Sequence, residues 1–127
     1  MINTAIIRCE KNMDKCPLTS CFAALSSRKG AFQIHHEDCA VTGIFTCHCP
    51  GDNVVEMANI LKNKGAEVIH FCTCAFATKG NGGWSMENGG FCKGIDEIIE
   101  RVHNETGIPC VKGTAHLPKD YTIQKWD

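Results

Sequence analysis

The chain has 127 residues, of which 43% are hydrophobic, and 13 Lys and Arg side chains against 14 Asp and Glu give a formal net charge of −1. This balance gives no electrostatic reason to expect a nucleic-acid or an anionic-membrane partner. No apolar run approaches the roughly 20 residues that a membrane-crossing helix needs. The length fits one domain over residues 1–127 with a single hydrophobic core.

Strand patterns alternate with helix patterns along the chain. In order, the sequence predicts a strand at 4–8, a helix at 18–29, a strand near 39–45, a helix between Asp52 and Gly65, a strand at 67–71, a helix from about Ile95 to Gly107, and a short strand at 108–111. Such alternation implies a parallel sheet with right-handed crossovers. The expected fold is α/β: a single three-layer domain with a parallel, flavodoxin-like sheet of about four strands.

Ten cysteines are the most informative feature of the chain, and most of them follow a predicted strand or precede a predicted helix. The carboxyl ends of parallel strands share one edge of the sheet, within roughly 5 Å per strand step, and that edge is where α/β folds bind ligands. Soft thiolates select zinc, copper(I) or iron–sulfur clusters. Eight cysteines are therefore candidate metal ligands at one mouth of the sheet: Cys9, Cys16, Cys21, Cys47, Cys49, Cys72, Cys74 and Cys92.

Cys39 and Cys110 fall within strands or at their amino-terminal side, and we interpret them as small buried hydrophobes. A disulfide scaffold is the competing interpretation of the whole set. It is disfavoured because the regular βα pattern supplies a core without cross-links. The N-terminus leads directly into a strand pattern and lacks the features of a signal peptide. We therefore expect a cytoplasmic, reducing location.

Two histidines are candidate ligands or proton carriers: His48 lies between Cys47 and Cys49, and His116 follows the last predicted strand. His70 is expected to be a satisfied interior group, whereas His35, His36 and His103 are expected at the solvated surface. The glycine-rich segment 79–90 lacks the phosphate-loop pattern. It is predicted to be either a lid over the cysteines, with Trp84 or Phe91 as the shield, or an ordinary surface loop.

Several short motifs resemble the landmarks of the CGGC-domain family, small Cys- and His-rich proteins described as metal-binding. The motifs are Arg8-Cys9-Glu10, Cys16-Pro17, Cys21-Phe22, Gly30-Ala31-Phe32, Cys49-Pro50-Gly51 and Gly113-Thr114-Ala115-His116. The resemblance covers nearly the whole chain and implies a metal site. Where the family has Cys-Gly-Gly-Cys before Pro-Gly, this chain has Thr46-Cys47-His48-Cys49, either a one-residue deletion or a shifted first cysteine.

The leading functional hypothesis is a cytosolic metal-binding protein with an iron–sulfur cluster used in electron transfer or cluster handling, and with a redox protein as partner. The alternative is a zinc-binding structural or regulatory protein. A metal-free thiol oxidoreductase using Cys47 or Cys49 is a weaker third hypothesis, because the usual redox pair has two intervening residues. Flavin binding is weaker still. Nothing in the sequence identifies a substrate or an oligomeric state, so enzymatic activity stays open.

Overall fold

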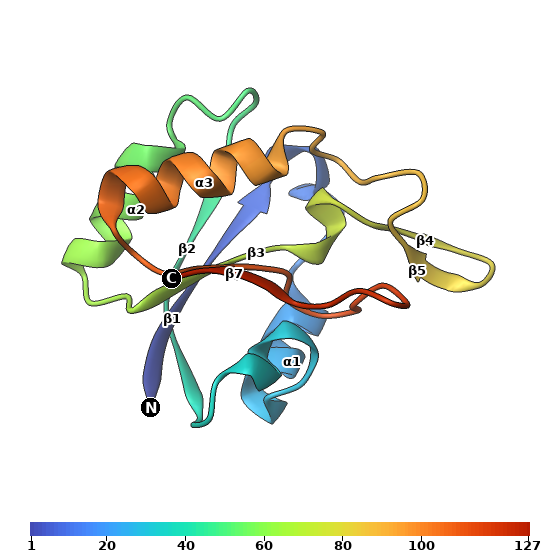
Figure 1. Cartoon of the computed structure of the whole chain (residues 1–127), viewed down its shortest axis with the longest axis horizontal. Helices are drawn as coiled ribbons and strands as arrows, with labels where there is room; N and C mark the ends of the chain where they lie inside the picture. Colours follow the sequence, from blue (N-terminus) through green and yellow to red (C-terminus); the bar gives the residue numbers. More distant parts are fainter.

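The computed structural model describes all 127 residues and contains a five-stranded, mostly parallel sheet in the order β2-β1-β3-β6-β7 (Figure 1). The first four strands in that order run parallel, and the edge strand β7 pairs with β6 in the antiparallel direction. The strands are β1 (Ile2–Cys9), β2 (Cys39–Cys47), β3 (Val68–Phe71), β6 (Cys110–Lys112) and β7 (Gln124–Trp126).

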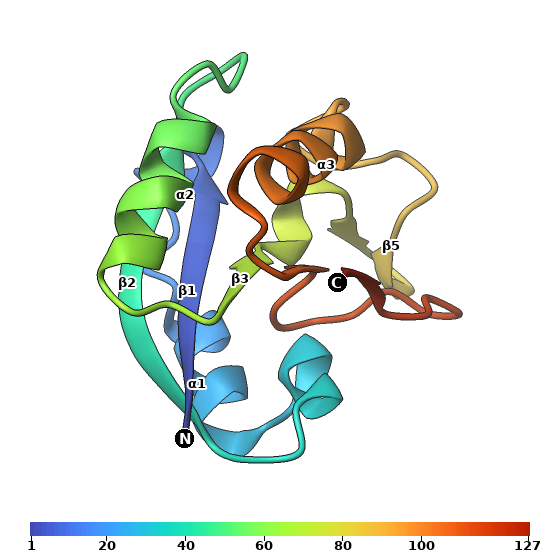
Figure 2. The same ribbon diagram turned by 60° about the vertical axis from the view of Figure 1, so that its left-hand side comes forward.

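The three helices are α1 (Thr19–Ser27), α2 (Val54–Asn63) and α3 (Ile95–Thr106). Helices α2 and α3 lie on one face of the sheet and α1 lies on the other (Figures 1 and 2). Two 3-10 segments, η1 (Glu10–Asn12) and η3 (Thr73–Ala75), follow β1 and β3, and a third, η2 (Gly30–Ile34), follows α1. No helix is both long and apolar enough to cross a bilayer.

The two-residue period of the strands divides the core into two parts. Ala5 and Ile7 of β1 pack with Ile69 and Phe71 of β3 against α2 and α3. Ile6 of β1 points the opposite way and packs against α1 in a separate cluster. Residues just beyond the end of a strand continue this alternation, so their position in the sequence indicates the face of the sheet on which they lie.

The helix pattern predicted between Asp52 and Gly65 is confirmed, since Val54, Met57, Ala58 and Leu61 are all buried along one face of α2. Helix α1 begins without a side-chain cap. Its N-cap is Leu18, which has a left-handed conformation and caps no N–H through its side chain.

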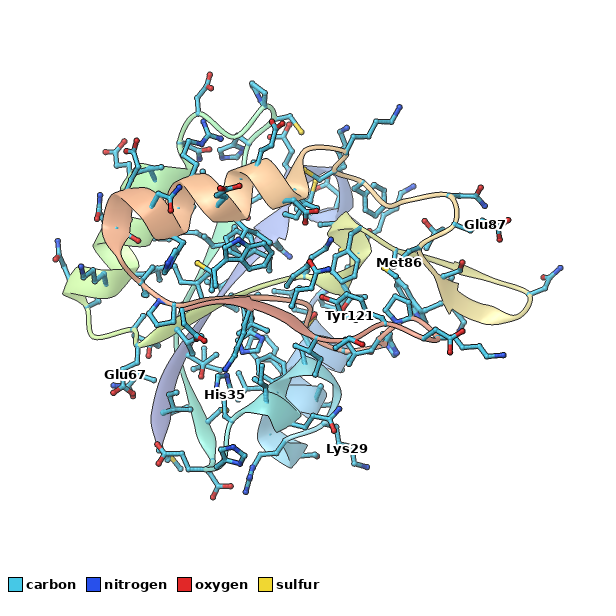
Figure 3. The ribbon with its side chains drawn as sticks, in the orientation of Figure 1. Lys29, His35, Glu67, Met86, Glu87 and Tyr121 are labelled. Atoms are coloured by element: carbon cyan, nitrogen blue, oxygen red, sulfur yellow. The ribbon has the colours of Figure 1, made fainter.

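The sheet has five strands rather than about four, because β7 adds an antiparallel edge strand. This strand is only three residues long, and its sequence shows too weak a pattern to predict it. The glycine-rich segment also contains structure. Strands β4 (Thr78–Gly80) and β5 (Gly83–Ser85) form a hairpin that projects from the body of the molecule (Figure 1). Met86 and Glu87 follow the hairpin and lie on this outer arm (Figure 3).

Candidate metal centre

The ends of β1 and β2 bring two cysteines side by side at the carboxyl edge of the sheet. Cys9 and Cys47 are register partners across the parallel pair. Cys9 continues the alternation of Ala5 and Ile7, and Cys47 continues that of Phe45, so both belong to the face that carries α2 and α3. Cys9 is buried and Cys47 is half-buried.

These two cysteines line a cavity of about 940 Å³ that also receives Cys49 and Cys92. Cys49 comes from the turn after β2 and is exposed, whereas Cys92 precedes α3 and is half-buried. Apolar residues of the strands and of α3 form other parts of the wall: Ile7, Phe71, Ile95 and Ile98. Four thiols from three separate segments thus share one cavity at the edge where α/β sheets bind ligands.

Backbone contacts with η3 fix the position of Cys92. The N–H of Phe91 donates to the carbonyl of Cys74 over 3.0 Å, and the N–H of Cys92 donates to the carbonyl of Ala75 over 2.8 Å. Gly90 permits this approach, because a Cβ built at that position would lie 2.4 Å from the Cys74 oxygen. The Lys11 ammonium also donates to the carbonyl of Phe91, over 3.3 Å.

The electrostatics of the cavity favour neutral thiols in the metal-free protein. Burial raises the pKa of Cys9 and raises that of Cys47 to about 11, and the neighbouring thiols of Cys49 and Cys92 add to both shifts. The guanidinium of Arg101 opposes the shift at Cys47. A metal bound here would have to displace protons from these thiols.

Three of the other predicted cysteines lie on the opposite face of the sheet. Cys72 follows His70 in the alternation of β3 and is buried against α1, where Cys21 joins it from the first turn of that helix. Cys74 in η3 packs half-buried against the same cluster. The three thiols therefore belong to one packed cluster on this face of the sheet.

Hydrogen bonding to Cys72 separates the acidities of this second group. It lowers the pKa of Cys21 to about 6 and also lowers that of Cys74, while the pKa of Cys72 itself is raised well above the usual value. Cys21 is further held by the Thr114 hydroxyl, whose Oγ1 lies 3.2 Å from its sulfur. Cys16 packs half-buried against the same cluster, and its sulfur accepts the Leu18 N–H over 3.4 Å.

Comparison with known protein families gives a match to the model of the CGGC domain over residues 3–115. The chain belongs to the CGGC-domain family. An uncharacterized protein of Methanocaldococcus jannaschii is 33% identical to it over 93% of this chain and 90% of the relative. No solved structure matches the chain. The cysteine-rich character of the CGGC domain suggests metal binding.

In this CGGC domain, neither of the two candidate histidines lines the cavity. His48 is largely exposed, and its Nδ1 lies 2.8 Å from Glu10 Oε2. His116 is exposed, has a left-handed backbone conformation and stacks on the ring of Trp84, with centroids 5.2 Å apart. Only Phe91 of the two proposed shielding residues contributes to the cavity wall.

Two other histidines of the CGGC domain, His35 and His70, lie within hydrogen-bond distance of each other. His70 is fully buried as expected, and its Nδ1 bonds to the Gly113 carbonyl over 2.8 Å. Its Nε2 lies 2.8 Å from Nε2 of His35. The expectation that His35 lies at the solvated surface is therefore wrong; it lies half-buried on the α1 side of the sheet (Figure 3).

The sequence did not single out the charged side chains of the cavity. Lys11, Lys93 and Arg101 line it together with Asp52 and Glu97. Arg101 lies on α3 and donates to the Gly51 carbonyl over 3.4 Å, which connects the helix to the turn that carries Cys49. Arg101 lies about two helical turns after Ile95 and therefore on a similar side of α3. This helical spacing is the only feature of the sequence that could have indicated that Arg101 faces the site.

Proposed function

We propose that this CGGC domain binds a thiolate-ligated metal centre in the cavity at the carboxyl edge of its sheet, with Cys9, Cys47, Cys49 and Cys92 as ligands. The centre is an iron–sulfur cluster that serves electron transfer or cluster handling. The observation that carries this proposal is the convergence of four thiols from three segments on one cavity of about 940 Å³. Soft thiolate donors match iron–sulfur clusters and zinc, and exclude the hard cations magnesium and calcium.

The position of the thiols in the fold supports a cluster rather than a structural zinc ion. Structural zinc holds together domains that are too small for a core of their own, whereas this domain has an extensive core. Thiolate ligands at the carboxyl edge of the sheet suit electron transfer or cluster handling. No group of three or more His, Cys, Asp or Glu side chains is arranged to hold one metal ion, so either cofactor would require the thiols to adjust on binding.

Charge and fold support the same location. Three cationic side chains, Lys11, Lys93 and Arg101, line the cavity against two carboxylates, which offsets the negative charge of thiolate ligands. We also propose that the fold is a flavodoxin-like three-layer variant. In the order β2-β1-β3-β6, the chain adds β2 on one side of β1 and then β3 and β6 on the other side. Such a switch point marks the ligand crevice in open α/β sheets.

An electron-transfer or cluster-handling role requires a second redox protein and a compartment in which thiols stay reduced, so we propose a cytoplasmic protein with a redox partner. All ten cysteines are free. The cavity opens beside Phe91 and the exposed Cys49, so a partner would approach from this edge. Within the proposal, His48, His116, Cys16, Cys21, Cys72 and Cys74 are not ligands.

The experiment is metal analysis of protein made anaerobically with iron and sulfide available. Brown protein with a broad visible absorption, iron and acid-labile sulfide is the expected result. Colourless protein with stoichiometric zinc would support the zinc alternative. Protein that binds neither metal but is active in a dithiol assay through Cys47 or Cys49 would refute the proposal and favour the oxidoreductase hypothesis.

A further inference from the structure

Three thiols meet on the α1 face of the sheet, where they contribute nothing to the cavity. Cys72 is 1% exposed, and Cys21 from α1 and Cys74 from η3 pack in the same cluster as Cys72. The three thiols lie on the opposite face of the sheet from the four cavity cysteines and line no part of that cavity.

Access differs within this thiol group. Cys21 and Cys72 are buried, whereas Cys74 is half-buried. Hydrogen bonds from the Cys72 thiol and from the Asn12 side chain lower the pKa of Cys74 and outweigh the opposing effect of its burial. Thiols that are reachable, partly ionised and next to a second thiol are the ones that react with disulfides and oxidants.

We propose that Cys21, Cys72 and Cys74 form a second, metal-independent site that exchanges thiols with low-molecular-weight disulfides. Cys74 is the attacking thiol and Cys72 the resolving thiol. This activity goes beyond the metal centre and uses none of its proposed ligands.

The exchange balances as two successive displacements. The Cys74 thiolate attacks one sulfur of the disulfide RSSR, which forms a Cys74–S–SR mixed disulfide and releases RS⁻. The Cys72 thiol then passes its proton to the Cys21 thiolate and attacks the Cys74 sulfur. The products are a Cys72–Cys74 disulfide, a second RS⁻ and a protonated Cys21. The two cysteines lose two electrons, and RSSR gains them.

Cys21 is placed to accept that proton. Its sulfur belongs to the same packed cluster as Cys72 and lies 3.2 Å from Oγ1 of Thr114. Thr114 is held in turn, because its N–H donates to Oγ1 of Thr73 over 3.0 Å. Hydrogen bonding to Cys72 and to Thr114 lowers the pKa of Cys21 to about 6, which favours the thiolate that would accept the proton.

The span between the two reacting cysteines suits a disulfide. One intervening residue keeps their Cα atoms within about 7 Å, and the 3-10 turn that begins at Thr73 shortens the span further. Disulfides bridge Cα separations of roughly 4.4–6.8 Å. A bond between such near neighbours is expected to be easily reduced, which suits exchange rather than structural cross-linking.

The test uses the reduced full-length protein and hydroxyethyl disulfide as the probe, followed by alkylation and peptide mapping. Cys72 and Cys74 lie on one tryptic peptide, between Lys64 and Lys79. The expected result is loss of two alkylatable thiols from this peptide, with its mass lower by two hydrogens. If both thiols stay alkylatable in excess probe, or if Cys72 is instead linked to Cys21 with Cys74 free, the proposal is overturned.

Variants test the roles separately. Cys72→Ala should accumulate the mixed disulfide on Cys74, Cys74→Ser should form none in this group, and Cys21→Ser should slow the second displacement roughly tenfold. Cys16→Ser is the matched control and should react as the natural protein does. Absence of the mixed disulfide in a folded Cys72→Ala protein would contradict the assignment of Cys74. Metal content should be unchanged in Cys74→Ser, so failure here is distinguishable from failure of the metal proposal.

Discussion

Cys9 and Cys47 are register partners at the carboxyl ends of two adjacent parallel strands, and both point to the face that carries α2 and α3. Neighbouring strands lie roughly 4.8 Å apart, so the backbone alone holds these two sulfurs in one neighbourhood. Cys49 and Cys92 then approach from a turn and from the segment before α3. The β-sheet therefore provides the rigid half of the proposed metal centre, and two connecting segments provide the rest.

Metal affinity should rise steeply with pH below pH 9. Burial raises the pKa of Cys9 and Cys47, so both thiols hold protons at neutral pH and must lose them on binding. Each proton released contributes about a tenfold gain in apparent affinity per pH unit. Chelator competition with zinc as the probe between pH 6.5 and 8.5 should give a gain of at least about a hundredfold per pH unit, the share of these two thiols alone. An affinity independent of pH would contradict the assignment of these two ligands.

Loss of the Arg101 charge should weaken metal binding. Its guanidinium lowers the pKa of Cys47 against the effect of burial, so Arg101→Gln should favour the protonated thiol. We expect a roughly fivefold lower affinity, or about 1 kcal/mol, measured by the same competition. Arg101→Lys keeps the charge and should recover most of the affinity, while Glu97→Gln, which removes a carboxylate from the wall, should increase it. Equal affinity for Arg101→Gln and the natural protein would exclude this electrostatic role.

Gly90→Ala should reduce metal content without unfolding the protein. A Cβ at Gly90 would clash with the Cys74 carbonyl at 2.4 Å, so the segment that carries Cys92 must move away from η3. Gly82→Ala is the control, because a Cβ there meets no atom within 4 Å. Metal per chain and far-UV circular dichroism should be measured for both. A Gly90→Ala protein with full metal content would show that the position of Cys92 is unimportant.

The face of each cysteine could have been predicted from strand alternation, whereas the position of Cys92 could not. Cys9 follows Ile7 by two residues and Cys72 follows His70 by two, so the period of the strands already assigns them to opposite faces. The prediction that eight cysteines share one edge of the sheet did not assign them to its two faces. The position of Cys92 depends on two hydrogen bonds to η3, which a glycine-rich sequence does not specify.

Most strands and helices followed from the residue pattern, but the β4–β5 hairpin, the strand β7 and the position of His116 did not. β7 is three residues long and forms only by pairing with β6, so its sequence carries little local signal. His116 follows the last parallel strand, yet its left-handed backbone conformation and its stacking on Trp84 lead it to the hairpin. Both outcomes depend on tertiary contacts between segments distant in sequence.

Acid should destabilise the metal-free protein through His70. Burial lowers the pKa of His70 from 6.5 to about 3, so the folded state keeps this ring neutral while the unfolded state binds a proton below pH 6.5. The stability from the neutral ring is present above pH 6.5 and is lost as pH falls toward 3, by up to about 1.4 kcal/mol per pH unit. The free energy of unfolding, measured with urea between pH 6.5 and 5, should change with pH less steeply in His70→Gln than in the natural protein, by about this amount. The exposed His36→Gln should retain the natural slope, and identical slopes in all three proteins would refute the assignment.

The most direct test of the metal centre is the iron and sulfide content of Cys47→Ser against Cys16→Ser, both made anaerobically. Both cysteines are half-buried and both are candidate ligands from sequence, but only Cys47 lines the cavity. Serine keeps the shape of cysteine and removes the soft donor. We predict that Cys47→Ser loses most of its cluster absorption and iron while Cys16→Ser retains the content of the natural protein. Equal loss in the two variants, or loss in Cys16→Ser alone, would contradict the placement of the metal centre in this cavity.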